Sequence, residues 1–327
     1  MDWAVIHPDP LIIALALLLD LIVGDPRWLP HPVALIGRLI NLLDHGIRRP
    51  WLDQRLAGTV LMLMTVGSAA GATWLALKGL GYMHPLAGLI GAIIISSTCL
   101  ATRSLHIESA RVATALSSGD LPLARQHLSW IVGRDTNQLE EPEIWRALVE
   151  TVAENTSDGI IAPLFWLTLG GPVAAMAYKA VSTLDSMVGY KNERYLQLGW
   201  ASARMDDLLN FIPARLTAML IIVAASLTEY SASGAIQITI RDRFKHPSPN
   251  SGHPEAAAAG ALGVRLGGMA SYNGISSLKE YIGDSRLPLD EKSYRGMIRL
   301  MYISTILMAA ACISVAFILR GLHVSFL

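Results

Sequence analysis

Long apolar runs separated by polar stretches are the main feature of this sequence. A membrane-spanning helix needs about 20 mostly apolar residues. Four runs reach or approach this length, and they are Ala57–Leu77, Leu86–Ala101, Ile212–Leu227 and Ile298–Leu319. The pattern predicts an all-α, polytopic integral membrane protein of one domain, residues 1–327, with roughly 4–6 membrane segments.

Two further apolar runs are irregular. Leu11–Val23 is short, and Asp20 interrupts it. Ile160–Val181 is long enough to span, but Gly170, Gly171 and Pro172 lie at its middle. Proline and paired glycines break or kink helices, and irregular backbone is tolerated in a membrane only where protein or water surrounds it. We therefore expect a broken or re-entrant segment there.

Basic residues near the apolar runs predict the orientation. The first ten residues contain no Lys or Arg, which argues against a cleavable signal peptide. The polar stretches Gly24–Leu56 and Thr102–Gly159 are rich in arginine, so both are expected on the cytoplasmic side of the cell membrane. The later polar stretches are also basic, so the number of true spans stays open. Within the polar stretches, Val33–Ile47 and Ile144–Thr156 have helical spacing.

Composition narrows the class further. Only 16% of the residues are charged, below the quarter typical of soluble domains, and the formal net charge is +0. Overall charge therefore gives no reason to expect a nucleic-acid partner. The two cysteines lie in apolar runs without a CxxC pair, which excludes a typical zinc cluster or disulfide framework.

Ionisable residues at membrane edges are costly, so their clusters are candidates for function. The first cluster, Gly24–Pro32, contains Asp25 and His31 on a proline-rich turn. An interfacial turn anchored by Trp28 explains it as well, and this structural interpretation is favoured. Another cluster spans Lys179–Arg194, where the positive charges of Lys191 and Arg194 could bind a phosphate group. The alternative for that cluster is a solvated loop.

Two clusters present carboxylates at helical spacing. Glu150, Glu154 and Asp158 recur every four residues, so on one helix they share a face and repel. Either Mg²⁺ or a nearby arginine would compensate them. Asp206 and Asn210 are spaced likewise and can hold a Mg²⁺–phosphate group, although such a short motif arises readily by chance.

The fifth cluster is a proline-rich loop, His246–Glu255. Two histidines and a glutamate in it suggest a metal site, but their spacing matches no helical zinc motif. A loop that presents polar groups to a ligand is the favoured interpretation. The sequence contains no GxxxxGK[ST], GxSxG or HExxH motif, so any use of ATP would not involve a common phosphate loop.

These clusters together closely resemble the CobD/CbiB family of cobalamin biosynthesis, the adenosylcobinamide-phosphate synthases, nearly end to end. The resemblance is carried by GDPRWLPHPVALIGRLI (Gly24–Ile40), ETVAENTSDGIIAPLFW (Glu150–Trp166), AYKAVSTLDSMVGYKNERY (Ala177–Tyr195), ARMDDLLNFIPARLTA (Ala203–Ala218), HPSPNSGHPEAAAAGALGVRLGG (His246–Gly268) and YNG (Tyr272–Gly274). It implies a membrane enzyme that joins adenosylcobyric acid to an amino-alcohol phosphate, typically (R)-1-aminopropan-2-ol phosphate, through an amide bond. ATP would be consumed, with Mg²⁺ as the expected cofactor. The oligomeric state and any association with later corrinoid enzymes stay open.

This activity would need a metal, cations and a base, and residue type suggests the candidates. The metal candidates are Glu154, Asp158, Asp206 and Asp207. The catalytic candidates are Glu154, Lys191, His253 and Glu255, with His253 or Glu255 as the general base and His31 as a reserve. The substrate-binding candidates are Asp25, His31, Asn155, Lys179, Tyr190, Asn192, Arg194, Arg215, Ser248, Asn250, Ser251, Tyr272 and Asn273.

Two alternatives belong to other classes. A Mg²⁺-dependent membrane prenyl- or phosphotransferase would use Asp206 and Asp207, but such enzymes usually show a second aspartate-rich motif. A non-enzymatic transporter or AmpE-like sensor would fit a membrane bundle. Against a transporter, the polar clusters flank the apolar runs, whereas transport sites usually lie near the midplane.

Overall fold

The computed structural model describes residues 9–25, 31–48, 53–190, 193–272 and 274–324. Four helical stretches in these ranges are long and apolar enough to cross a membrane: Gln54–Met83, Pro85–Ser117, Glu141–Val188 and Glu291–Arg320. A fifth candidate is the pair Trp200–Leu209 and Phe211–Ser226, which is bent by 45°. The predicted all-α, multi-pass membrane protein with a broken segment is confirmed. The short apolar run near the N-terminus forms a helix of 13 residues, Pro10–Ile22.

Contacts within the chain define two compact units, each assembled from segments far apart in the sequence. The first unit contains Met1–Ala101, Ala162–Asn210 and Ala309–Leu327. The second contains Thr102–Ile161 and Phe211–Met308. The expectation of a single membrane domain stays a prediction.

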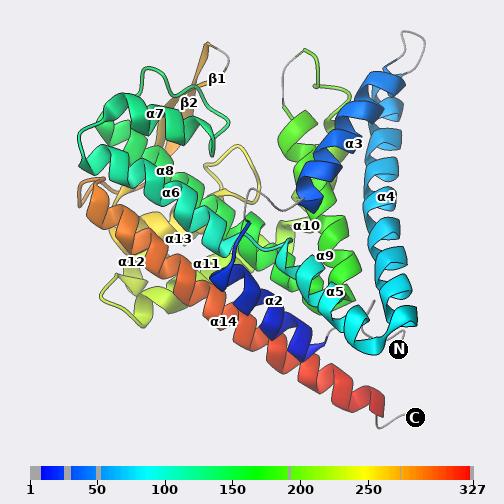
Figure 1. The fold of residues 1–327 in the computed structure, drawn as a ribbon. Helices are drawn as coiled ribbons and strands as arrows, with labels where there is room; N and C mark the ends of the chain where they lie inside the picture. Colours follow the sequence, from blue (N-terminus) through cyan, green and yellow to red (C-terminus); the bar gives the residue numbers. More distant parts are fainter. Residues whose placement is uncertain (1–8, 26–30, 49–52, 191–192, 273, 325–327) are drawn as a thin grey trace. The chain divides into compact units, whose positions relative to one another are not determined.

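The first unit is a bundle of apolar helices. Its elements are α2 (Pro10–Ile22), α3 (Pro32–Ile47), α4 (Gln54–Met83), α5 (Pro85–Ser97), α9 (Ala162–Val188), α10 (Trp200–Leu209) and the end of α14 (Glu291–Val324). Figure 1 shows α4 running beside α3 and α9, and α4 also contacts α5 and α10. A buried cluster of Ile12, Leu77 and Ala92 joins α2, α4 and α5.

Helix α9 is interrupted where the sequence predicts a break. Gly170 and Gly171 leave the helical conformation, and Gly171 has a φ of 66°. This left-handed conformation is costly for residues with a Cβ but not for glycine. Pro172 follows directly and cannot donate the missing backbone hydrogen bond. The Gly-Gly-Pro sequence is thus the local cause of the break.

The second unit is built around one short, fully buried helix. Its elements are α6 (Thr102–Ser117), α7 (Leu121–Ser129), α8 (Glu141–Thr156), the π-helix η1 (Ser157–Ile161), α11 (Phe211–Ser226), α12 (Ala232–Asp242), α13 (Gly252–Leu262), β1 (Arg265–Tyr272), β2 (Ile275–Gly283) and the start of α14. Every residue of α13 is buried, and the helix contacts α8, α11, α12 and both strands. A Cβ at Gly260 would overlap the Gly234 carbonyl oxygen, so these glycines let α12 and α13 touch.

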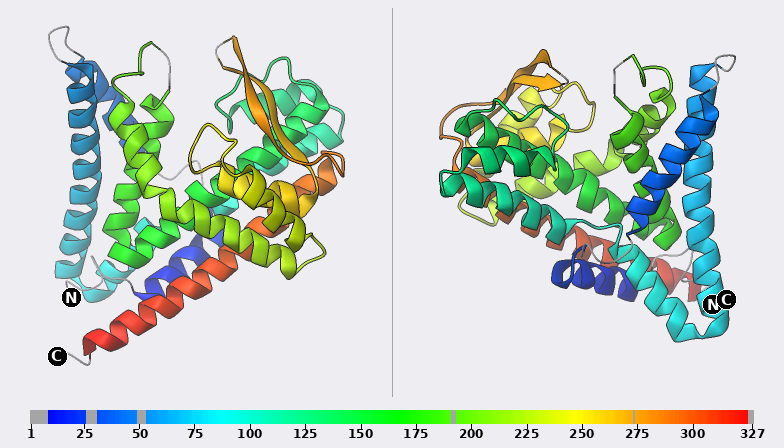
Figure 2. Two further views of the ribbon diagram at one scale, coloured as in Figure 1. Left: turned by 180° about the vertical axis from the view of Figure 1, so that it is seen from behind. Right: turned by 45° about the horizontal axis from the view of Figure 1, so that its top comes forward.

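A β-hairpin in the second unit was not predicted from the sequence. Strands β1 and β2 pair antiparallel, and Figure 2 shows them as a long ribbon alongside α13. The pairing is irregular between Leu266 and Gly268, where Gly267 of β1 lies opposite two residues of β2, Glu280 and Tyr281, so β2 bulges. The adjacent glycines 267 and 268 interrupt the alternation of apolar and polar residues that is typical of a strand, and they are not β-branched. The usual sequence signal for a β-strand is therefore absent here.

Candidate active site in the second unit

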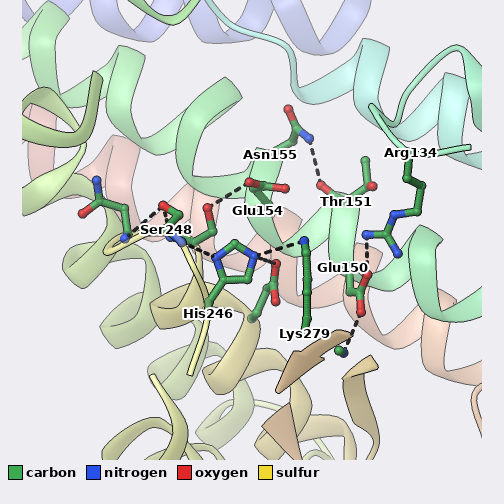
Figure 3. Close-up of polar contacts among 12 residues, drawn as sticks. Arg134, Glu150, Thr151, Glu154, Asn155, His246, Ser248 and Lys279 are labelled. Carbon is green, nitrogen blue, oxygen red and sulfur yellow. Dashed lines mark hydrogen bonds and ion pairs between the residues drawn. The ribbon is translucent and has the colours of Figure 1, made fainter. Parts of the chain in front are cut away.

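The first feature of the site is a buried carboxylate on α8, Glu150. The Arg134 guanidinium donates to its Oε2 at 2.6 Å, and the Gly267 N–H donates to its Oε1 at 2.7 Å. The Nε of Arg146 lies 3.8 Å from Oε1. Figure 3 shows Arg134 and Glu150 facing each other. Nearby arginines, one of the two kinds of partner expected for the α8 carboxylates, thus compensate the negative charge of Glu150.

The irregular part of the hairpin supplies a further partner of Glu150. Gly267 of β1, opposite the bulge of β2, has a φ of 80°, and a Cβ there would overlap the Glu280 carbonyl oxygen. Glycine adopts this left-handed conformation without the steric cost that other residues have. The Gly267 N–H donates to the Glu150 carboxylate, 117 residues earlier in the chain.

Glu154, one helical turn further along α8, faces the proline-rich loop. The Ser251 hydroxyl donates to Glu154 Oε1 at 2.8 Å. Ser248 orders this loop, because its hydroxyl accepts from the backbone N–H groups of Asn250 and Ser251 at 3.2 and 3.3 Å. Asn155 instead donates to the Thr151 carbonyl oxygen within α8. Ser248, Ser251 and Glu154 therefore lie together, as the sequence analysis expected for a polar site.

His246, Glu255 and Lys279 meet at one point (Figure 3 labels His246 and Lys279). The His246 Nε2 lies 3.7 Å from Glu255 Oε1 and 3.4 Å from Lys279 Nζ. The Ser248 N–H donates to His246 Nδ1 at 3.0 Å. Because Nδ1 accepts this bond, the proton of neutral His246 belongs on Nε2, the atom facing Glu255.

The electrostatics of this group favour proton transfer. Burial, together with the nearby Glu150 and Glu154, raises the pKa of Glu255 well above its ordinary value. Burial and the positive charge of Lys279 lower the pKa of His246. Burial also opposes the charge of Lys279, but Tyr272 and Glu255 outweigh it and the pKa of Lys279 is raised. Groups with pKa values displaced in this way are typical of catalytic sites.

His253 lies in a different environment from His246. It is buried, its ring makes an edge contact with Phe244 at 5.9 Å between centroids, and its Nε2 has no hydrogen-bond partner among the described residues. Burial and the charges of Arg215 and Arg243 lower the pKa of His253 to about 4. His253 is therefore a neutral imidazole at pH 7.

The carboxylates of the second unit can contribute to a magnesium site. Among the described residues, no group of three His, Cys, Asp or Glu side chains is placed to hold a metal ion. Mg²⁺, however, is usually held by one or two carboxylates together with substrate phosphates and water. Glu154 is half-buried, and its Oε1 accepts a hydrogen bond from the neutral Ser251 hydroxyl, so its negative charge fits this role. The expected even spacing ends before Asp158, because the π-helix η1 begins at Ser157 and widens the turn.

In the clusters Gly24–Pro32 and Lys179–Arg194 of the first unit, the candidates His31 and Arg194 contact neighbouring carboxylates. The His31 Nε2 lies 2.9 Å from Asp25 Oδ1, and His31 Nδ1 accepts from the Val33 N–H to cap α3. This supports the interpretation of that cluster as a structural turn. Arg194 lies 3.5 Å from the buried carboxylate of Asp44 on α3.

The aspartate-rich cluster is on α10, also in the first unit. Asn210 donates to Asp206 Oδ2 at 3.0 Å, so the predicted shared face is confirmed, and it accepts from the Tyr178 hydroxyl at 2.8 Å. Asp207 and Lys179 are half-buried, and Tyr190 is exposed. The candidates Lys191, Asn192 and Asn273 lie outside the described residues.

Comparison with known proteins places these features in a family. The family model described as CobD/Cbib protein matches residues 13–301. This chain belongs to the CobD/CbiB family. It is 63% identical over 98% of its length to "Cobalamin biosynthesis protein CobD" of Pelobacter propionicus, covering 99% of that relative.

More distant members of the CobD/CbiB family match over similar lengths. The chain is 46% identical to the protein named CobD of Citrobacter koseri, over 94% of the chain and 97% of the relative. It is also 46% identical to "Cobalamin biosynthesis protein CbiB" of Salmonella choleraesuis, over 94% and 98%. No solved structure matches the chain.

Sequence reasoning gave no site role to four residues that complete the cluster in this family member. They are Arg134, Arg146, His246 and Lys279. Arg146 precedes Glu150 by one helical turn, so its spacing was an available signal. His246 begins the proline-rich loop, and the second histidine of that loop, His253, was chosen as the candidate base instead. Lys279 lies on the unpredicted hairpin, so no sequence signal placed it near the glutamates.

Proposed function

We propose that this protein is an ATP-dependent amide ligase that joins adenosylcobyric acid to an amino-alcohol phosphate, such as (R)-1-aminopropan-2-ol phosphate, to give adenosylcobinamide phosphate. Membership of the CobD/CbiB family supports a role in cobalamin biosynthesis. The observation that carries the specific reaction is the cluster of Glu154, His246, Glu255 and Lys279, which combines oxygen ligands, a cation and a proton acceptor.

The reaction requires an activated carboxyl group. A carboxylate resists attack by an amine, so ATP transfers its γ-phosphoryl group to a carboxylate oxygen, and ADP leaves. The amine nitrogen then attacks the carbonyl carbon of the acyl phosphate, an amide bond forms, and inorganic phosphate leaves. Phosphoryl transfer depends on positioning and on positive charge around the transferred group. Lys279, whose Nζ lies 3.4 Å from His246 Nε2, is the candidate for this positive charge.

The amine must lose a proton to attack, and Glu255 is our candidate for the base. A carboxylate with a raised pKa is a stronger base, because it holds the proton that it takes from the amine more tightly. Its high pKa has a physical cause, namely burial beside Glu150 and Glu154. His246 would position Glu255 through its Nε2–H, since Ser248 determines which ring nitrogen carries the proton.

Mg²⁺ would be held by Glu154, with Asp158 as the second candidate ligand. When bound, it supplies charge neutralisation at the phosphates of the nucleotide. Glu154 would be oriented for this by the Ser251 hydroxyl. We place the protein in the cytoplasmic membrane of the cell.

Corrinoid-dependent nucleotide hydrolysis tests this function. The purified protein in detergent would receive Mg-ATP with adenosylcobyric acid, aminopropanol phosphate, both or neither. We expect nucleotide turnover above background only when the corrinoid is present, with ADP as the product of the acyl-phosphate route. AMP would instead indicate an adenylate intermediate. Nucleotide that stays intact with both substrates would favour the prenyltransferase or sensor alternatives.

A further inference from the structure

Two arginines of the second unit, Arg215 and Arg243, have no carboxylate partner among the described residues. Arg215 donates to the Phe211 carbonyl oxygen at 2.5 Å and to Asn250 Oδ1 at 3.3 Å. Among the described residues, Arg243 donates to the carbonyl oxygens of Thr239 and Ile240 in its own helix. Arg125 and Arg265 likewise form no ion pair there, and they contact the Leu139 carbonyl oxygen and the Tyr281 ring. Seven other arginines of the unit do pair with carboxylates, and these are Arg111, Arg134, Arg146, Arg241, Arg286, Arg295 and Arg299.

Both arginines are held at the N-terminus of α13. Asn250, which binds Arg215, comes two residues before the helix. A Cβ at Gly252, the first residue of α13, would overlap the Arg243 carbonyl oxygen, so the two backbones are in contact. No side chain caps this helix end. At this helix end the His253 N–H donates to the Asn250 carbonyl oxygen and Pro254 has no N–H, so the side chains, and not the helix backbone, are the donors available to an anion.

A buried histidine at the same place lacks a partner. His253, the second residue of α13, is only 5% exposed, and its Nε2 makes no hydrogen bond among the described residues. A buried polar atom without a partner costs free energy, so such atoms are rare in folded proteins. The Phe244 ring, which follows Arg243 in the chain, packs against the imidazole and holds its orientation.

We propose that the side chains of Arg215, Arg243 and His253, beside the start of α13, form a subsite for the phosphate group of a phosphate monoester. A dianionic phosphate would accept hydrogen bonds from both guanidiniums, which suit it in charge and geometry. It would also give the His253 Nε2 a partner and relieve the repulsion between the two arginines.

This inference rests on the proposed function for the source of the phosphate. The proposed base, Glu255, lies two residues after His253 in α13, so we expect a small ligand that carries a phosphate at one end and a reacting group at the other. The amino-alcohol phosphate has that form, with phosphate and amine a few bonds apart. The terminal phosphate of the nucleotide has the same chemistry.

Equilibrium binding tests the subsite without turnover. The full chain in a maltoside detergent, which contains no phosphate, would be titrated with aminopropanol phosphate, with unphosphorylated aminopropanol and with a non-hydrolysable ATP analogue. We expect Arg243→Gln and Arg215→Gln to weaken binding of one phosphorylated ligand by about 10- to 100-fold. Binding of unphosphorylated aminopropanol should not change. Arg299→Gln is the matched control, because it removes an equal charge from an exposed ion pair with Glu229.

The ligand that loses affinity identifies the source. Weaker binding of aminopropanol phosphate alone assigns the subsite to the amino-alcohol phosphate, and weaker binding of the analogue alone assigns it to the nucleotide. Unchanged affinity for both in the two folded variants would overturn the subsite, as would an equal loss in Arg299→Gln. If Arg243→Gln does not fold, Arg243→Lys keeps the charge without the two-pronged geometry and should weaken the same ligand to a smaller extent. A wild type that binds phosphate through these residues yet never ligates would refute the function but keep the subsite.

Discussion

Glu150→Ala is expected to destabilise the second unit by about 3–5 kcal/mol. The Arg134 side chain is only 9% exposed, so the substitution would leave a buried guanidinium without its partner. The Gly267 N–H, opposite the bulge of β2, would lose its acceptor as well. The midpoint of thermal or denaturant unfolding in detergent, read from a tryptophan signal, measures the effect.

A second substitution separates the lost charge pair from a general packing defect. Arg134→Met in the Glu150→Ala background should recover part of the loss, because no unpaired charge then stays buried. Glu229→Ala is the matched control, since its partner Arg299 is exposed and surface ion pairs contribute only about 0–1 kcal/mol. A Glu150→Ala variant as stable as Glu229→Ala would show that the Arg134–Glu150 pair does not support the hairpin.

Glu255→Gln should lower kcat for amide formation by about 10²–10⁴-fold. The amide has nearly the shape of the carboxyl group but cannot accept the amine proton. The rate of product formation at saturating substrates measures this change. Glu229→Gln makes the same chemical change at an exposed position and should leave kcat unaltered. Full activity of Glu255→Gln would remove Glu255 from the mechanism.

The same variant should be more stable than the wild type at alkaline pH. The folded-state pKa of Glu255 is raised above that of an unfolded glutamate, about 4.3. The folded protein therefore holds this proton more tightly, and the contribution to stability is complete below the unfolded pKa and is lost as the pH rises through the folded pKa. Glu255→Gln cannot ionise and should lack this loss. The free energy of unfolding of both proteins would be measured from pH 5 to 8.5. If it changes with pH by the same amount in both, the pKa of Glu255 is not raised.

The helices were predictable because local signals specify them. Ile298–Leu319 lies within α14, and the apolar face of Val33–Ile47 corresponds to α3. The Gly170–Pro172 break followed from backbone chemistry alone, since only glycine tolerates the conformation and proline lacks the donor. In each case the residues that cause the structure are neighbours in the chain.

The site was predictable only in part, because its contacts join distant segments. Glu154 and Ser251 were both candidates, but their hydrogen bond spans 97 residues and no spacing rule predicts it. Lys279 meets His246 through a hairpin whose glycines hide the strand pattern. Sequence reasoning chose His253 as a candidate base and assigned no role to His246. Only tertiary packing shows that one faces a carboxyl group and the other faces two arginines.

Mass spectrometry of the reaction product tests the proposed ligase most directly. The purified protein would be incubated with adenosylcobyric acid, aminopropanol phosphate and Mg-ATP, and each component would be omitted in turn. We expect a product with the mass of the two substrates less one water, formed only in the complete mixture and with release of one ADP per product. If a folded, monodisperse sample forms no such product with any of several amino-alcohol phosphates, the protein is not the proposed ligase.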